Sequence, residues 1–130
     1  MDIALIDTSA WIDFFRGEPK AVRRVDVLLQ SDSARLCGPV YAEILSGARN
    51  KAEQQELKLH LLAVPRIEIQ EPAWERTADV RFALARMGRQ SSLLDVMIAQ
   101  TAVDWGARLL TRDQDFERMR GIVPFDLDLF

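Results

Sequence analysis

Short apolar runs alternate along this chain with longer segments of helical periodicity, and this alternation constrains the fold most. Five runs are typical of buried strands, the last of them weaker: Ile3–Ile6, Arg35–Cys37, Arg66–Ile69, Arg108–Thr111 and Ile122–Phe125. Helical segments begin near Ser9, Pro19, Pro39, Ala52, Pro72 and Ser92, and a short helical turn follows Gln114. The pattern predicts an α/β fold, a three-layer α/β/α sandwich around a short parallel sheet of about five strands.

The composition predicts a single domain that spans residues 1–130. A chain of 130 residues can bury a core without disulfides, and no apolar run approaches the length of a membrane span. A strand-like run begins at Ile3, so we expect no signal peptide. The single cysteine, Cys37, lies in a strand-like stretch, which predicts a buried structural thiol and a reducing, cytoplasmic setting.

The net charge of −3 argues against a protein that binds nucleic acid through an overall positive charge. The chain carries 17 basic and 20 acidic residues. If four acids surround a metal ion, the remaining surface is nearly neutral. Local contact with nucleic acid therefore stays possible, whereas a large non-specific footprint does not.

One aspartate, Asp95, lies where a helix should not tolerate a carboxylate. In a helix from Ser92 to Trp105, Gln100 and Asp104 fall on one side, which we expect to face solvent. Asp95 falls almost opposite them, on a face with these apolar residues: Ile98, Ala99 and Ala102. A carboxylate in such a place must be paired, protonated or bound to a metal. The alternative is structural, because Ser92 and Asp95 also match a capping box at the helix start.

Four acids should meet at one edge of the sheet. Asp7 follows the first strand, and Glu43 lies in the first turn or so of the helix after the second strand. Asp95 lies in the first turn of the helix that leads into the Arg108–Thr111 strand, and Asp113 lies just beyond that strand. The carboxyl ends of parallel strands share one edge, and ligands gather there at the point where the strand order reverses. Each acid alone could instead cap a helix or turn, and periodicity alone places Glu43 on the surface.

Four crowded carboxylates repel one another unless a cation neutralises them. A set without histidine or thiolate suits Mg²⁺ or Mn²⁺ better than zinc. The only histidine, His60, lies in a charged helical segment far from these acids in the sequence, so we expect it at the surface. Carboxylate-bound magnesium is the usual partner of phosphate esters.

The motifs that carry these acids resemble those of PIN-domain ribonucleases, in particular the VapC-type toxins of bacterial VapBC toxin–antitoxin pairs. Four segments match in order and span nearly the whole chain: Leu5–Asp13, Pro39–Gly47, Leu94–Ala99 and Leu110–Phe116. The resemblance implies an acidic pocket of Asp7, Glu43, Asp95 and Asp113 that holds one or two Mg²⁺ or Mn²⁺ ions and cleaves RNA, leaving a 5′-phosphate and a 3′-hydroxyl. It also implies supporting roles for these residues: Thr8, Ser9, Thr111 and Asp115.

Between Asp113 and Asp115 we favour Asp113 as the metal ligand, with Asp115 as an indirect support or a helix cap. The resemblance further implies a homodimer and a small DNA-binding, VapB-like antitoxin that lies in an apolar groove. The first helical region offers aromatic and aliphatic material for it, although at least two of these residues should pack in the core: Trp11, Ile12, Phe14 and Phe15. Three arginines near the acids could bind RNA phosphates: Arg16, Arg112 and Arg118.

Two other functions are compatible with acids at this edge. A phosphoryl-receiver or phosphohydrolase domain is the weaker alternative, because the chain lacks a suitably placed lysine: its only lysines are Lys20, Lys51 and Lys58. A catalytically idle PIN module that only binds a partner is the other.

Overall fold

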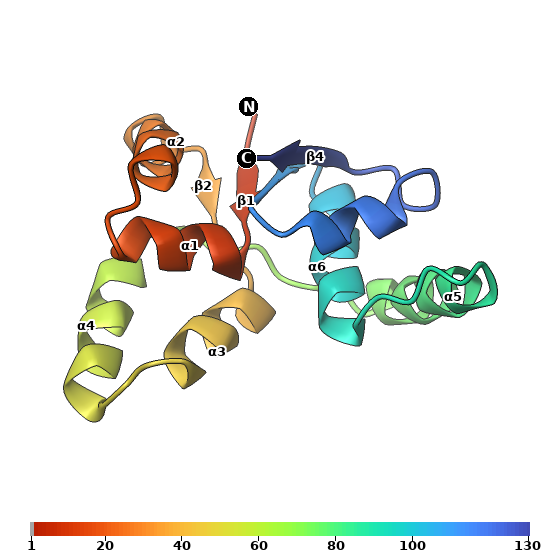
Figure 1. The fold of residues 1–130 in the computed structure, drawn as a ribbon, viewed down its shortest axis with the longest axis horizontal. Coiled ribbons are helices and arrows are strands. Elements are labelled where there is room, and N and C mark those ends of the chain that lie inside the picture. The colour runs from red at the N-terminus through yellow and green to blue at the C-terminus, as the bar shows by residue number, and fades with distance from the viewer. Residues whose placement is uncertain (1) are drawn as a thin grey trace.

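The computed structural model describes residues 2–130, and helices and strands alternate in it much as the sequence predicts (Figure 1). The strands are β1 (Ala4–Ile6), β2 (Ala34–Arg35), β3 (Arg108–Thr111) and β4 (Asp126–Leu129). The helices are α1 (Thr8–Phe15), α2 (Pro19–Gln30), α3 (Gly38–Ser46), α4 (Lys51–Leu61), α5 (Pro72–Arg86), α6 (Leu93–Asp104) and the 3₁₀ helix η1 (Gln114–Met119).

Within the described residues the sheet has four strands rather than five, all parallel, in the order β2-β1-β3-β4. The predicted strand Arg66–Ile69 forms only one bridge, in which Leu36 donates to the carbonyl of Pro65 and accepts from Ile67. The ladder stops there because the next residue, Cys37, already caps α3. The strand order reverses between β1 and β3, which makes this pair the switch point of the sheet.

The last strand lies at Asp126–Leu129, directly after the predicted run Ile122–Phe125 and not within it. The backbone N–H of Val123 donates to the carbonyl of Met119, so this run completes the turn after η1. Pro124 has no N–H to donate to a neighbouring strand. Of this run only Val123 is fully buried, and Pro124 is exposed. The run is therefore a partly buried turn, and the alternating segment after it pairs with β3.

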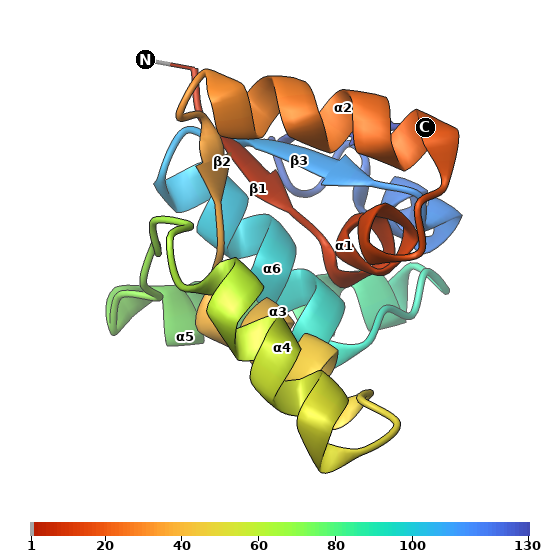
Figure 2. The ribbon, with the colours of Figure 1, turned by 90° about the vertical axis from the view of Figure 1, so that its left-hand side faces the viewer.

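The sheet lies between two helical layers, as predicted. Helix α2 covers one face and α6 the other (Figure 2). Gln100 of α6 is buried and donates to Asp104, so the prediction that Gln100 faces solvent is wrong. Helix α6 is covered on most sides because α5 also packs against it. No helix within residues 2–130 is both long and apolar enough to span a membrane.

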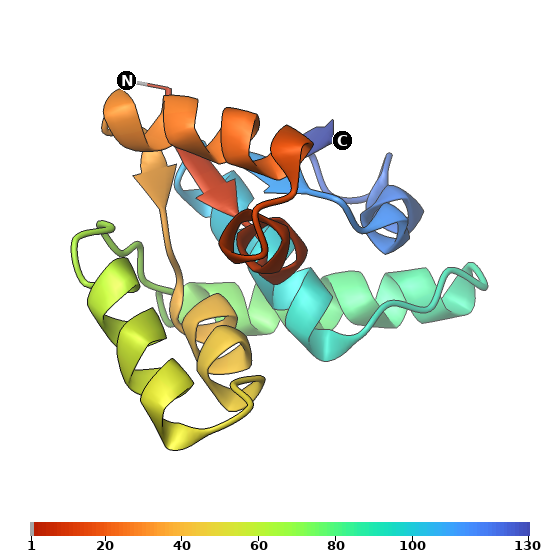
Figure 3. The same ribbon diagram turned by 60° about the vertical axis from the view of Figure 1, so that its left-hand side comes forward.

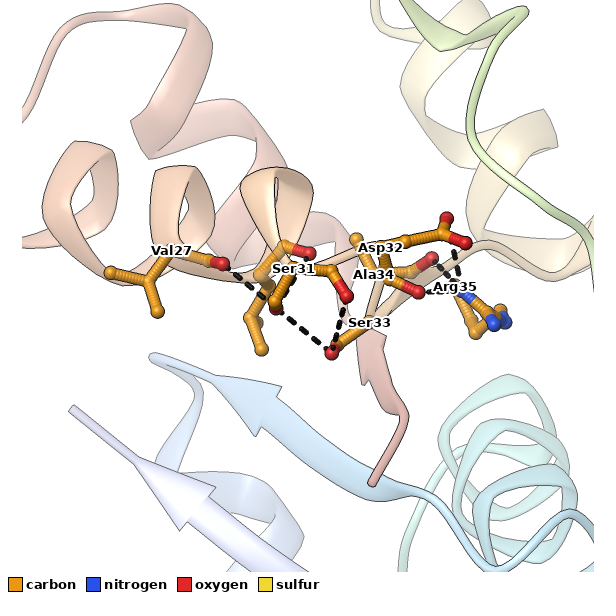
Figure 4. Close-up of polar contacts among 7 residues, drawn as sticks. Val27, Ser31, Asp32, Ser33, Ala34 and Arg35 are labelled. Atoms are coloured by element: carbon orange, nitrogen blue, oxygen red, sulfur yellow. Dashed lines mark hydrogen bonds and ion pairs between the residues drawn. The ribbon is translucent and has the colours of Figure 1, made fainter. Parts of the chain in front are cut away.

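The turn from α2 into β2 shows how the sequence ends a helix next to the sheet (Figure 4). The hydroxyl of Ser31 donates to the carbonyl of Val27 at 2.9 Å and lies 2.9 Å from the hydroxyl of Ser33. Asp32 between them has a φ of 56°, a left-handed conformation that aspartate tolerates better than most residues. The Arg35 guanidinium donates to the Asp32 carbonyl, which fixes the start of β2.

Several element ends meet at the carboxyl edge of the sheet. Helix α1 begins directly after β1 and lies at its arrowhead (Figure 3). Helix α3 begins shortly after β2, and η1 begins shortly after β3. Helix α6 contacts α3 and η1 as well as β3. This arrangement brings sequence-distant residues to one place.

Candidate active site

The four predicted acids line one cavity of about 320 Å³, which we call the acid cavity. Asp7, Glu43, Asp95 and Asp113 reach it from four different elements. The remaining lining residues are Thr8, Ser9, Ile12, Arg16 and Arg112. The structure therefore brings these acids to one cavity at the sheet edge, with Thr8 and Ser9 beside them.

Asp7 is the most firmly held of the four carboxylates. Its Oδ2 accepts from the hydroxyl of Thr111 at 2.8 Å and from the hydroxyl of Ser9 at 2.9 Å. The backbone N–H of Ser9 also donates to this oxygen, so Asp7 caps α1 as well. Capping and site roles are compatible here, because a carboxylate has two oxygens and only Oδ2 takes part in these bonds.

The two hydroxyls that hold Asp7 are themselves held by the backbone that follows β3. The N–H of Asp113 donates to the Thr111 hydroxyl at 2.9 Å, and the N–H of Arg112 donates to the Ser9 hydroxyl at 3.1 Å. Each hydroxyl thus accepts from an amide and donates to Asp7. Thr111 is fully buried and lies behind the cavity, not in its wall. Folding of the β1–β3 pair therefore orients Asp7.

Glu43 lies in the second turn of α3, close to the predicted place in the first turn or so. Its Oε1 accepts from the hydroxyl of Thr8 at 2.7 Å, which links α3 to the start of α1. The long glutamate side chain reaches the cavity from this position. Helical periodicity placed Glu43 at the surface, and only the packing of α3 beside α1 brings it to the site.

Asp95 projects from the start of α6 into the acid cavity. Ser92 is the N-cap, and its hydroxyl accepts from the backbone N–H of Asp95 at 3.1 Å, so the cap that the sequence suggested exists. The Asp95 carboxylate remains free to line the cavity. Burial, followed by the negative charges of Asp7 and Asp113, raises the pKa of Asp95 from 3.8 to about 6.

Asp113 and Asp115 occupy different places. Asp113 lines the cavity and caps η1, with its Oδ1 accepting from the N–H of Asp115 at 2.9 Å. Asp115 is exposed, lies outside the cavity lining and pairs with Arg118 at 3.4 Å. The geometry therefore favours Asp113 over Asp115 as the candidate ligand. Asp115 contacts Asp113 only through its backbone N–H.

Cys37 and His60 lie outside the acid cavity lining, as expected. Cys37 is fully buried, and burial with the nearby charges of Asp7 and Glu43 raises the pKa of its thiol to about 11. It is therefore a protonated, structural thiol at neutral pH. His60 is exposed on α4, with its ring centroid 5.9 Å from that of Phe15.

Of the three arginines near the acids in sequence, Arg16 and Arg112 line the acid cavity. Arg118 lies outside that lining, where it donates to the carbonyl of Gln90 and pairs with Asp115. Arg112 also pairs with Asp13, a buried acid of α1 that the sequence reasoning missed. The signal was present, because Asp13 stands among aromatic residues of a helix just as Asp95 stands among apolar ones.

The donor set of the acid cavity fits a hard divalent cation. Its lining offers four carboxylates and two hydroxyls, with no histidine or thiolate. Among residues 2–130, no three acidic, histidine or cysteine side chains already stand as close together as ligands of one ion. Besides burial, the negative charges of Asp7, Asp113 and Glu43 help to raise the pKa of Asp95, and a bound cation would neutralise this repulsion.

Comparison with known proteins decides the family. The PIN-domain model matches residues 4–122. The chain belongs to the PIN-domain family. VapC ribonuclease Mb1587 of Mycobacterium bovis and ribonuclease VapC11 of Mycobacterium tuberculosis are each 35% identical to it over 118 residues, 87% of this chain and 88% of theirs. Among solved structures, VapBC2 from Rickettsia felis has a TM-score of 0.81 over 98% of both chains at 18% identity, which supports the PIN fold.

Proposed function

We propose that this PIN-domain protein is a Mg²⁺- or Mn²⁺-dependent endoribonuclease and the toxin of a VapBC-type toxin–antitoxin pair. One observation carries the proposal: four carboxylates from four elements line a single cavity at the switch point of the sheet. The relatives named VapC ribonuclease, similar over most of both chains, support the same activity. The cytoplasmic location stays a prediction from the single cysteine.

In this proposal Asp7, Glu43, Asp95 and Asp113 hold the cation. When bound, it would activate a water molecule and neutralise charge that develops on the phosphodiester. The chain's own residues supply the orientation. The amides of Arg112 and Asp113 fix the hydroxyls of Ser9 and Thr111, and these hydroxyls hold Asp7. Thr8 holds Glu43 in the same way.

Cleavage of labelled structured RNAs by the purified chain in Mg²⁺ or Mn²⁺ tests the proposal. We expect Asp7→Asn and Asp95→Asn each to lower kcat/KM by about 100-fold or more, which corresponds to about 2.7 kcal/mol of transition-state stabilisation. Asp79→Asn, the same change on the exposed surface of α5, is the matched control and should cleave at the wild-type rate. Wild-type cleavage by the Asp7→Asn variant, or cleavage that persists in EDTA, would refute the proposal.

The proposed antitoxin partner has a candidate binding surface in a groove of about 470 Å³ between α1, α3 and α4. Its apolar lining includes Ile12, Phe15, Ile44 and Leu57. Ile12 and Arg16 line both this groove and the acid cavity, so a segment bound in the groove would end beside the acids. Trp11 is fully buried instead, as expected for part of this aromatic set.

The proposed homodimer has a different candidate surface, on α5 and the start of α6. Phe82 and Leu93 are 60% and 50% exposed there and line one cavity. Two variants separate the surfaces. Phe82→Glu should turn a dimer into a monomer in light scattering and still bind the proposed VapB-like antitoxin. Phe15→Glu should lose that partner and remain a dimer, and the opposite pattern would refute both assignments.

Family membership removes the phosphoryl-receiver alternative, since the chain is a PIN domain. A catalytically idle PIN module would bind Mn²⁺ at the acid cavity and leave every RNA intact, so the cleavage assay above also decides that alternative.

A further inference from the structure

A second cavity, of about 420 Å³, adjoins the acid cavity and carries a different charge. We call it the α2 cavity, because it surrounds the start of α2; its lining residues are Asp13, Glu18, Pro19, Lys20, Ala21, Arg23, Arg112 and Phe130. Arg112 is common to the two linings. A chain that leaves the acid cavity at this side therefore meets Arg112 first and the other cations next.

Arg112 is held in place through its backbone and through its side chain. Its backbone N–H donates to the Ser9 hydroxyl, and its Nε lies 2.5 Å from Oδ2 of Asp13. The Asp13 side chain is 11% exposed, whereas that of Arg112 is 53% exposed. Because Nε makes this contact, the two terminal nitrogens of the guanidinium are available to a phosphate. Asp13 thus uses a buried charge to fix an arginine at the junction of the cavities.

The other two cations of the α2 cavity have no acidic partner in the structure. Within residues 2–130, neither Lys20 nor Arg23 lies within 4.0 Å of a carboxylate, and both are exposed. The Phe130 ring adds an aromatic wall. Asp13 and Glu18 also line the cavity, so three basic side chains stand against two acidic ones and the lining keeps a net positive charge. A positively charged groove with an aromatic side chain is the combination by which proteins bind single-stranded nucleic acid.

We propose that the substrate RNA strand runs from the acid cavity over Arg112 into the α2 cavity. Arg112 binds the phosphate next to the cleaved one, Lys20 and Arg23 bind phosphates further along, and Asp13 is a positioning residue for Arg112. This path gives a polyanion a cationic approach to a cavity of four acids, on a protein whose net charge is −3. The inference rests on the proposed ribonuclease function.

Binding of a fluorescein-labelled, mixed-sequence 12-nucleotide RNA in EDTA tests the path without cleavage. Each single-strand phosphate contact contributes about 0.7 to the slope of log K against log salt, so Lys20→Gln/Arg23→Gln should lower the slope by about 1.4 and weaken binding by about 10-fold. Lys51→Gln/Lys58→Gln, the same charge change on α4, is the matched control. A double variant that binds like this control would overturn the path.

The Asp13–Arg112 pair is tested by a double-mutant cycle in the same assay. Arg112→Gln should lower the slope by about 0.7, and Arg112→Lys should restore part of it. Asp13→Asn should reproduce much of the loss and add nothing to Arg112→Gln, because it acts through that arginine. An Asp13→Asn variant that changes the melting temperature and leaves the salt slope unchanged would overturn the positioning role.

Kinetics with Mn²⁺ distinguish failure of the path from failure of the function. Cations that bind flanking phosphates equally in the ground and transition states should affect KM and leave kcat within about twofold. If wild-type chain binds RNA as described and never cleaves it, the ribonuclease proposal fails and the path stands. If Lys20→Gln/Arg23→Gln cleaves with unchanged KM, the path fails and the function stands.

Discussion

Asp7 and Asp95 face the same cavity, one from the end of a central strand and the other from the start of a helix. Asp7 accepts three hydrogen bonds on one oxygen, from two hydroxyls and an amide. Asp95 is partly buried beside three other acids, which raises the pKa of its carboxyl. Folding therefore organises the Asp7 side, whereas the Asp95 side carries an electrostatic cost that a bound cation would relieve.

Adding a cation should produce the largest difference between the Asp7 side and the Asp95 side of the cavity. An ion at 100 times its Kd stabilises a folded protein by about 2.7 kcal/mol, so Mn²⁺ should raise the melting temperature of the wild type. The effect should shrink most in Asp95→Asn, which removes a ligand and the repulsion together. Thermal unfolding with Mn²⁺ or EDTA measures it, and Asp79→Asn serves as the control. Equal Mn²⁺ stabilisation of wild type and Asp95→Asn would contradict the assignment of Asp95 as a ligand.

Thr111→Val tests the Asp7 side, which folding organises, and leaves all four carboxylates in place. The change removes a donor to Asp7 and leaves the Asp113 amide without its buried acceptor, so we expect a loss of about 1–3 kcal/mol in the free energy of unfolding. Cleavage should fall as well, because Asp7 loses its orientation. Thr111→Ser keeps the hydroxyl and should retain most of the activity. A Val variant with wild-type stability and rate would show that the hydroxyl chain does not hold Asp7.

The organised side was only partly predictable from the sequence. Asp7 and Asp113 stand directly after strand-like runs, so their position follows from the fold class alone. The chain of amide, hydroxyl and carboxylate depends on β1 pairing with β3 in one register, which no local pattern encodes. Glu43 needed the packing of α3 beside α1 for the same reason.

The prediction of the last strand was wrong because a run of apolar residues was interpreted as a strand. The run Ile122–Phe125 is a turn in which only Val123 is fully buried, and Pro124 prevents regular pairing there. The strand that does form, β4, alternates aspartate with leucine and is less apolar than the run before it. The role of Asp13 was not predicted because its partner, Arg112, is distant in the sequence and reaches it only in the folded chain.

Asp95→Asn should stabilise the metal-free protein above pH 6, in contrast to Asp7→Asn. The pKa of Asp95 is raised from 3.8 to about 6, so the folded protein binds more protons than the unfolded chain between these values. Stability from this group therefore falls as the pH rises through that window. The amide avoids this cost, and after allowance for solvent screening we expect a gain of about 1–2 kcal/mol.

The free energy of unfolding in urea, measured in EDTA at about pH 7.5 and at about pH 3.5, checks this sign, because these two pH values bracket the window between the two pKa values. The gain should be present at the higher pH and nearly absent at the lower one, where the Asp95 carboxyl is mostly protonated in the folded and in the unfolded protein. Asp7→Asn should instead lose about 1 kcal/mol, since a neutral amide oxygen accepts the three hydrogen bonds less strongly. The same sign for the two variants at pH 7.5 would end the contrast between the two sides.

Thr8→Val should have the smallest effect. It tests whether Glu43 is oriented by folding, as Asp7 is, or by the cation, as we propose for Asp95. The Thr8 hydroxyl donates to Glu43 at 2.7 Å from a partly exposed position, where water can replace it. We expect a loss of about 0.5–1.5 kcal/mol in the free energy of unfolding and a larger loss in Mn²⁺ affinity than in stability. Thr8→Ser is the control. Unchanged Mn²⁺ affinity in Thr8→Val would mean that Glu43 finds its place through the cation, as Asp95 does, and that only the strand ends are organised by folding.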